Sequence, residues 1–309
     1  MTRVARSMEE AHGFGPCAVA IGVFDGVHCG HQELLRRTVA TARELGVKSA
    51  VLTFHPHPAC VVAPERAPRQ LYSVEERCEL LASQGIDEVL VLPFDESIAE
   101  MPPEGFAAGP LRAILQARAV LVGDNFRFGC GRAGDISTLA QLGFVTRPLP
   151  AVKLRGLVVS SSEIRKRIEG GEVSLAGRLL GRPYAISGEI VSGHGIGSKQ
   201  TVPTLNLRTP AEVLPSNGVY ITRTKDLNHG TRWNSITNIG TRPTFDNAGG
   251  LSIETFLLDP LTTPTPERIR LEFLHRVRPE RKFESPEALK TQILRDVATA
   301  RSYFHRLNW

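Results

Sequence analysis

The feature that most constrains the fold of this chain is a change of sequence pattern close to Pro183. Before that residue, short apolar stretches alternate with stretches whose apolar residues recur at helical spacing. After it, the apolar stretches are short and are separated by Gly, Pro and Asn. The two patterns belong to different fold classes, so we expect two domains, at residues 1–183 and 184–309. A length of 309 residues also favours two domains over one.

The first half predicts an α/β domain built on a doubly wound parallel sheet. The expected strands occupy residues 17–23, 48–54, 87–92 and 119–122. The expected helices occupy residues 31–45, 73–83, 104–116, 161–169 and 172–180. Strands and helices that alternate in this way are typical of a parallel sheet with helices on its faces. Ligands of such sheets bind beyond the carboxyl ends of the strands.

The second half predicts a small antiparallel β-barrel followed by a terminal helix. The expected strands occupy residues 185–191, 218–222, 235–239, 251–258 and 268–273. Many short strands separated by turn residues are typical of a barrel. The last segment, residues 287–303, predicts an amphipathic helix because its apolar residues recur on one face. That face is expected to carry Leu289, Ile293, Leu294, Val297 and Ala300.

Composition excludes several classes of protein. A hydrophobic fraction of 41% and a charged fraction of 22% are ordinary for a soluble globular chain. No run of about 18 apolar residues is present, so we expect no membrane span, and the N-terminus lacks the apolar core of a signal peptide. The net charge of +5 is mild and the arginines are dispersed, and small phosphorylated substrates would explain the surplus as well as nucleic acid would. We expect no nucleic-acid partner. Self-association remains open.

The five cysteines indicate the compartment. They occupy positions 17, 29, 60, 78 and 130, show no CxxC spacing and are odd in number. This usage favours free thiols in a reducing environment. We therefore expect a cytoplasmic protein.

The stretch GVFDGVHCGH, residues 22–31, leaves the first expected strand and enters the first expected helix. Its two histidines could belong to a metal site, a buried pair or a phosphate site. A zinc site would need further ligands from elsewhere, such as Cys60 or Cys78. A helix N-terminus offers unpaired N–H groups, Gly30 leaves the backbone accessible, and imidazoles donate hydrogen bonds to phosphate. His28 and His31 alone leave the phosphate site and the buried pair both open.

The second half contains a candidate nucleotide loop. Gly193, Gly195 and Gly197 recur at every second position, which allows backbone N–H groups to surround phosphates. The same glycines could form a flexible hairpin. Thr204 and Asn206 follow, and their oxygen atoms suit Mg²⁺ carried by a nucleotide. A solvated strand end is the alternative for these two residues.

Four blocks of the first half occur in the order of one known family. They read GVFDGVHCGH at 22–31, TFHPHP at 53–58, GDNFRFGCGR at 123–132 and SSSEIR at 160–165. Together they resemble the adenylyltransferase module of the prokaryotic bifunctional riboflavin kinase/FMN adenylyltransferases. The family usually has Thr where this chain has Ser162, and the hydroxyl is kept. The resemblance implies that this half joins AMP from ATP to FMN, giving FAD and pyrophosphate.

The same resemblance implies residue roles. His28 and His31 would contact the phosphates of ATP, and Asn125 would lie near the transferred phosphate. A second helix N-terminus would clamp the phosphates through Ser161, Ser162 and Arg165, the last of which suits bidentate contact with phosphate. Asp25 would organise either Mg²⁺ or the histidine loop. Further nucleotide-binding residues would be Gly22, Phe24, Gly26, Gly30 and Asp124. Phe126 and Phe128 could pack in the core or contact flavin.

Blocks of the second half resemble the riboflavin kinase module of the same family. They read PTLN at 203–206, NIGTRPTF at 238–245, SIETFLLD at 252–259 and RPERKF at 278–283. The resemblance implies that Glu254 is the general base that removes the proton from the ribityl 5′-hydroxyl of riboflavin. It also implies Mg²⁺ on Thr204 and Asn206 and ATP as phosphate donor. Riboflavin, FMN and ATP are then the expected ligands.

This half also departs from the family pattern. Ser198 stands where Arg is usual, Thr201 stands where Gly is usual, and Leu205 replaces Ala. The missing Arg removes a phosphate-facing cation, and a β-branched Thr disfavours the positive φ open to Gly. Two alternatives to a bifunctional enzyme follow. One is an FAD synthetase with an impaired kinase domain, and the other is a flavin-binding regulator without turnover.

Overall fold

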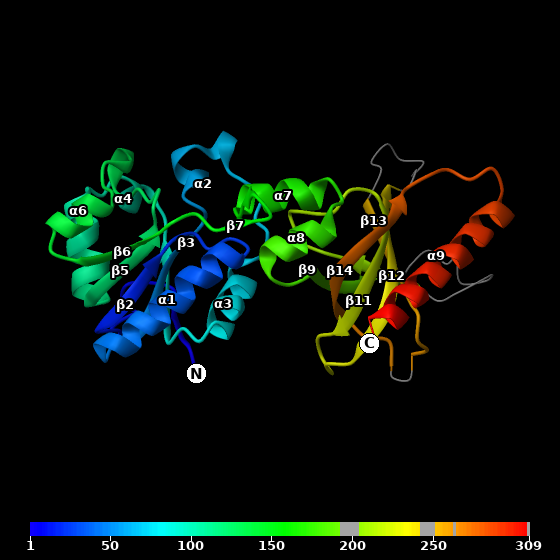
Figure 1. Ribbon diagram of the computed structural model, residues 1–309, viewed down its shortest axis with the longest axis horizontal. Coiled ribbons are helices and arrows are strands. Elements are labelled where there is room, and N and C mark those ends of the chain that lie inside the picture. The colour runs from blue at the N-terminus through cyan, green and yellow to red at the C-terminus, as the bar shows by residue number, and fades with distance from the viewer. Residues whose placement is uncertain (192–203, 242–250, 262–263, 308–309) are drawn as a thin grey trace. The chain divides into compact units, whose positions relative to one another are not determined.

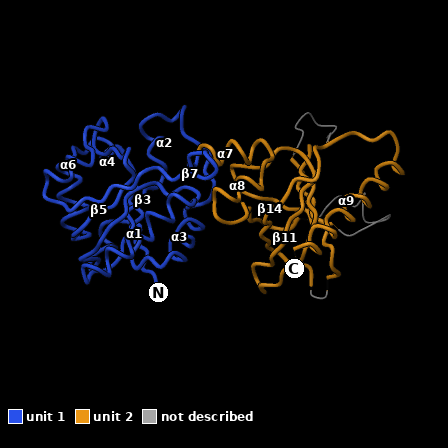
Figure 2. The backbone as a smooth tube through the Cα atoms, viewed as in Figure 1, with its two compact units in different colours: residues 1–161 blue, residues 162–309 orange. Residues whose placement is uncertain are grey.

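The computed structural model describes residues 1–191, 204–241, 251–261 and 264–307 (Figure 1). By packing, the chain divides into two compact units, Met1–Ser161 and Ser162–Trp309 (Figure 2). The first holds a six-stranded parallel sheet and the second a closed six-stranded antiparallel barrel, which confirms both expected fold classes. The helices at residues 161–169 and 172–180, which were expected in the α/β half, group instead with the second unit, and the second of them contacts barrel strands. The functional boundary at 183/184 remains a prediction.

The strand order of the parallel sheet indicates where a ligand could bind. Its strands run in the order β1-β4-β3-β2-β5-β6, and every neighbouring pair is parallel. From β2 the chain adds β3 and β4 on one side, and then β5 on the other side of β2. The order therefore reverses between β2 and β5, and such a switch point is where ligands bind. The strands are β1 (Arg3–Ala5), β2 (Cys17–Ile21), β3 (Lys48–His55), β4 (Glu88–Pro93), β5 (Ala117–Gly123) and β6 (Val145–Leu149).

Both faces of this sheet are covered, because successive residues of each strand point to opposite sides. Cys17, Val19 and Ile21 belong to one apolar cluster, whereas Ala18 and Ala20 belong to another. The second cluster contains buried residues of the two long helices of this unit. The helices are α1 (Cys29–Leu45), α2 (Ala59–Val62), α3 (Val74–Ser83), α4 (Glu96–Ala99), α5 (Pro103–Phe106) and α6 (Ile136–Gln141). A short hairpin, β7 (Lys153–Leu154) and β8 (Leu157–Val158), precedes the second unit.

The helix expected at residues 104–116 has two parts. It begins as α5 and continues as a π-helical segment over Ala107–Ile114. Pro110 lies inside this segment, and its carbonyl accepts the N–H of Leu115, five residues later. Proline lacks an N–H and clashes with the preceding turn of a regular α-helix, so a wider turn accommodates it.

The barrel closes in the order β10-β13-β12-β11-β14-β9, with antiparallel pairs throughout. Strand β10 is an addition to the five strands expected from the sequence. The strands are β9 (Tyr184–Val191), β10 (Thr204–Arg208), β11 (Gly218–Asp226), β12 (Arg232–Thr241), β13 (Leu251–Leu257) and β14 (Arg268–Pro279). Buried hydroxyl groups link β11, β12 and β13, through Thr222 to Thr237 at 2.7 Å and Thr237 to Thr255 at 2.9 Å.

Three helices complete the second unit: α7 (Ser161–Glu169), α8 (Val173–Leu180) and α9 (Pro286–Arg306). The prediction of the buried face of α9 is wrong in part, because Leu289 and Leu294 are 41% and 58% exposed. Ala300 lies on the buried face as expected, together with Asp296, whose carboxylate accepts a hydrogen bond from Nε of Arg278 at 2.9 Å. The buried face of α9 thus combines this ion pair with the apolar contacts of Ala300 and Phe304.

No helix in the described part of the chain is both long enough and apolar enough to cross a membrane.

Candidate active sites

The first candidate site lies where β2 ends and α1 begins. His28 is the N-cap of α1, and its Nδ1 accepts the backbone N–H of His31 at 3.2 Å. The two imidazole rings stack, with centroids 3.6 Å apart and planes 13° apart. Because Nδ1 of His28 is an acceptor, a neutral ring carries its proton on Nε2. The helix start thus has both an electropositive end and a defined imidazole donor.

The loop that delivers His28 has a strained backbone. Phe24 and Val27 have φ values of +55° and +38°, a region that side-chain-bearing residues seldom occupy. Both side chains are buried in the cluster between the sheet and its helices. Strain of this kind persists only where surrounding contacts determine the conformation, and it concentrates at functional sites.

Polar contacts hold the same loop. The buried carboxylate of Asp25 accepts the backbone N–H of Leu71, at 3.0 Å to Oδ1. The backbone carbonyl of Asp25 accepts the hydroxyl of Ser161 at 2.8 Å. Ser161 is the last residue of the first unit and the first residue of α7. Of the two roles that the resemblance implied for Asp25, organisation of the histidine loop is the one these contacts favour.

Two glycines of this stretch make room for rings. A Cβ atom on Gly30 would lie 3.2 Å from the imidazole of His28, and one on Gly22 would lie 3.3 Å from the ring of Phe24. Gly26 adopts a φ of +83°. Gly30 was expected to leave the backbone open to a ligand, and the imidazole of His28 is its close neighbour in the structure.

The loop after β5 reaches the same edge, because β2 and β5 are parallel neighbours. Asp124 and Asn125 begin this loop, and both are exposed. Phe126 and Phe128 stack with centroids 5.6 Å apart, and Phe128 is buried in the other apolar cluster. Packing in the core therefore accounts for Phe128, whose ring Phe126 partly covers.

Ser162 and Arg165 continue α7, which groups with the second unit. Ser162 is exposed and Arg165 is partly buried. The structure thus brings together His28, His31, Asp25 and Ser161, with Asp124 and Asn125 at the neighbouring strand end.

The metal interpretation of the two histidines receives no support. Within residues 1–191, 204–241, 251–261 and 264–307, no group of three or more His, Cys, Asp or Glu side chains could hold a metal ion. Burial raises the pKa of the Cys78 thiol, which disfavours the thiolate that zinc requires.

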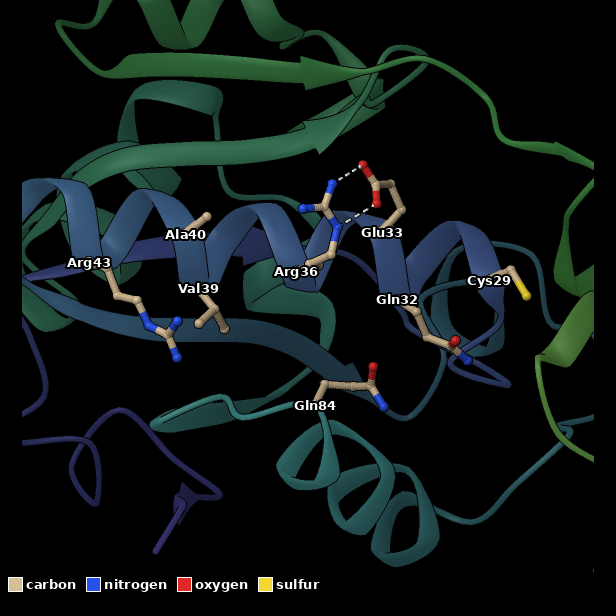
Figure 3. Close-up of a pocket in the computed structure, with 8 residues that line it drawn as sticks. All are labelled: Cys29, Gln32, Glu33, Arg36, Val39, Ala40, Arg43 and Gln84. Carbon is tan, nitrogen blue, oxygen red and sulfur yellow. Dashed lines mark hydrogen bonds and ion pairs between the residues drawn. The ribbon is translucent and has the colours of Figure 1, made fainter.

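A cavity of about 660 Å³ runs along the outside of α1 (Figure 3). Its walls are mostly side chains of that one helix, with Gln84 from the end of α3 opposite. Glu33 accepts two hydrogen bonds from Arg36, each of 2.8 Å. Cys29, to which the sequence analysis gave no role, lines the end of this groove nearest the histidine loop.

The second candidate site is a row of polar side chains across three barrel strands. Asn206 of β10 pairs with Glu254 of β13, which in turn pairs with Asn238 of β12. Directly opposed residues of antiparallel strands share one face of the sheet, so the three half-buried side chains are neighbours. Ser252, two residues before Glu254, donates its hydroxyl to Oε1 of that carboxylate at 2.9 Å.

Thr204 lies two residues before Asn206 and therefore on the same face. Gly193, Gly195 and Gly197 of the candidate nucleotide loop lie outside the described residues. The same is true of Ser198 and Thr201. Sequence reasoning missed Ser252 and Asn238 as members of this site. Period-two spacing from Glu254 could have indicated Ser252, but only the strand register identifies Asn238.

Comparison with known proteins covers both units. A family model described as FAD synthetase matches residues 11–163, and one described as riboflavin kinase matches residues 180–304. The bifunctional riboflavin kinase/FMN adenylyltransferase of Pseudomonas fluorescens is 37% identical over 290 residues, covering 93% of this chain and 92% of its own. The enzyme of the same name from Haemophilus influenzae is 34% identical, covering 94% of each chain.

One solved structure is similar over almost the whole chain. It is described as a macrolide-efflux protein from Streptococcus pneumoniae and is 27% identical to this chain. The TM-score is 0.86, and the alignment covers 97% of this chain and 98% of the other.

Proposed function

Because this chain belongs to the family of bifunctional riboflavin kinase/FMN adenylyltransferases, we propose that its two reactions take place at the two candidate sites described above. The protein phosphorylates riboflavin with ATP to give FMN, and it transfers AMP from ATP to FMN to give FAD and pyrophosphate. One observation carries the two-site assignment: each family model covers its own candidate site, one at the α1 N-terminus and one on β13.

At the first site, adenylyl transfer needs placement and charge stabilisation more than covalent chemistry. A phosphate oxygen of FMN forms a bond to the α-phosphorus of ATP, and the bond to the bridging oxygen of pyrophosphate breaks. Nε2–H of His28, together with His31 and the N–H groups of α1, stabilises the charge that grows on the phosphate oxygens. The fixed tautomer of His28 and its stacking on His31 support this role.

The remaining residues of the first site shape and close it. Ser161, Ser162 and Arg165 bind phosphate at the start of α7, and the bond from Ser161 to the loop supports this assignment. Asp124 and Asn125 contact the nucleotide from the end of β5. Four loop residues keep the backbone in position: Gly22, Phe24, Gly26 and Gly30.

At the second site, Glu254 is the general base for the ribityl 5′-hydroxyl. Its central place between Asn206 and Asn238 supports this assignment, because neighbouring amides can bind the substrate around a carboxylate. The hydroxyl of Thr204 and the amide oxygen of Asn206 are hard ligands that fit Mg²⁺. When bound, Mg²⁺ supplies positive charge to the γ-phosphate of ATP. Gly193, Gly195 and Gly197 would surround the phosphates of that nucleotide.

We also propose the cytoplasm as the compartment, supported by five cysteines that are all free thiols.

The two-site assignment is tested by variants that each remove the proposed catalytic groups of one site. We expect Glu254→Ala to abolish FMN formation from riboflavin and to leave FAD formation from supplied FMN unchanged. We expect the double variant His28→Ala, His31→Ala to do the reverse. Both reactions are followed by chromatographic separation of riboflavin, FMN and FAD. If either variant, shown to be folded, loses both reactions, the assignment to two sites is wrong.

A further inference from the structure

A buried arginine joins the ends of two strands beneath the histidine loop. Arg77 belongs to α3 and is 3% exposed. Its NH1 donates to the carbonyl of Val23 at 2.7 Å, and its NH2 donates to the carbonyl of Phe54 at 3.0 Å. Val23 follows β2, and Phe54 lies near the carboxyl end of β3. The guanidinium therefore holds two neighbouring strand ends at the edge where ligands of parallel sheets bind.

The carbonyl of Val23 receives a second donor. The hydroxyl of Thr53, which is fully buried, donates to it at 2.9 Å. One carbonyl oxygen thus accepts from two sides, which uses both of its lone pairs. Val23 directly precedes Phe24, the first residue of the loop with a positive φ. The two donors therefore act where the strained segment begins.

Stability alone does not explain this arrangement. A buried guanidinium is costly unless its charge and its donors are satisfied, and Nε of Arg77 has no acceptor among the described residues. Burial lowers the pKa of Arg77, and the nearby carboxylate of Asp25 opposes that effect. Asp25 belongs to the same loop. Both hydrogen bonds that the guanidinium donates thus go to strand ends, one of which begins the loop that carries the histidines.

We propose that Arg77 is a positioning residue for adenylyl transfer, which acts by clamping the Val23 carbonyl together with Thr53. Without the clamp, Phe24 and Val27 relax from positive φ, and the imidazole of His28 leaves its position over the start of α1. The proposal rests on the proposed function, in which His28 and His31 bind the phosphates of ATP. Displacement of a catalytic group by about 1 Å can cost roughly 10²-fold in rate.

The test compares two Thr→Val substitutions, each of which removes a buried hydroxyl that donates to a backbone carbonyl. Thr53→Val removes the second donor to Val23. Thr38→Val is the control, because Thr38 is also fully buried and donates its hydroxyl to a carbonyl, that of Leu34, at 2.8 Å. Arg77→Met removes the clamp itself, and Arg77→Lys keeps the charge without the planar fork. For each full-length variant we would measure kcat and the KM values for ATP and FMN in FAD formation, well below the unfolding temperature.

We expect Thr53→Val to lower kcat/KM for ATP about fivefold, and Arg77→Met to lower it about 100-fold, with a raised KM for ATP and an unchanged KM for FMN. Arg77→Lys should recover part of the loss, and Thr38→Val should match the wild type. Well below the unfolding temperature the folded fraction stays near one, and a fall in it would weaken the binding of ATP and FMN alike. A KM that rises for ATP alone therefore separates positioning from stability. If Arg77→Met does not fold, the proposal is decided by comparing the KM for ATP of Thr53→Val with that of Thr38→Val.

Wild-type KM for ATP in Thr53→Val and Arg77→Met would overturn the proposal, and so would equal losses in Thr53→Val and Thr38→Val. Failure of the proposed function has a different signature. In that case the double variant His28→Ala, His31→Ala keeps FAD formation, whatever the result for Arg77.

Discussion

At the scale of the residue, His28 joins local structure to chemistry. Its Nδ1 caps α1 by accepting the N–H of His31, and that bond places the ring proton on Nε2. A single side chain thus both starts the helix and supplies a donor at the helix end that favours anions. Gly30 supports both roles, because a Cβ there would crowd the imidazole at 3.2 Å.

The two roles of His28 can be separated by substitution. Asn is a good N-cap, so His28→Asn should keep the stability of the first unit, whereas His28→Ala should lose about 1 kcal/mol. Both variants should lose most FAD formation, because neither keeps an imidazole donor. Thermal unfolding and FAD formation from supplied FMN measure the two effects. Wild-type activity in His28→Asn would show that the cap is the only role of this residue.

At the scale of the element, strand pairing assembles the second site. Asn206, Glu254 and Asn238 are far apart in sequence and become neighbours because β10, β13 and β12 pair in one register. A slip of one residue in β13 would move Glu254 to the other face of the barrel wall. The alternation along β13 also brings Ser252 to Glu254.

The Ser252 contact leads to a prediction for this strand. The hydroxyl orients one oxygen of the carboxylate, so Ser252→Ala should lower kcat for FMN formation about tenfold and leave the KM for riboflavin unchanged. Ser252→Thr keeps the hydroxyl on a strand-favouring residue and should restore most of the rate. FAD formation from supplied FMN is the internal control. Equal kcat in Ser252→Ala and the wild type would contradict the orienting role.

At the scale of the whole molecule, one chain combines a parallel sheet and an antiparallel barrel, each with its own site. FMN is the product of one site and a substrate of the other. Each unit has its own apolar core. The first unit has an apolar cluster on each face of its sheet, and the second unit has a cluster between barrel strands and α9. With one proposed site in each unit, we expect that each reaction can be impaired without the other.

This organisation predicts complementation in a mixture. Glu254→Ala should make no FMN from riboflavin, and the His28→Ala, His31→Ala variant should make FMN but no FAD. Mixed together with riboflavin, ATP and Mg²⁺, they should make FAD, because FMN released by one molecule reaches the other. Chromatography of the flavins over time measures this. FAD that forms only when both sites belong to one chain would contradict free exchange of FMN.

Much of this protein was predictable from sequence because the evidence is local. Hydrophobic periodicity indicated both fold classes, and the helices expected at residues 31–45 and 73–83 were confirmed as α1 and α3. The blocks around His28 and Glu254 indicated the family. The exposure of Leu289 and Leu294 was not predictable from spacing, because α9 packs through Ala300 and Phe304 and also buries Asp296 against Arg278.

The sequence by itself therefore determined the two fold classes, the family and the residues able to carry its chemistry, because periodicity and motifs are properties of short segments. Only the tertiary structure decided how those residues are held. Arg77 lies 54 residues from Val23 and Glu254 lies 48 residues from Asn206, and no local pattern records either pairing. Hydrogen bonds from buried groups to strand ends, and the register between strands, depend on the packing of distant segments. That packing fixes the strained loop that carries His28 and the surroundings of Glu254.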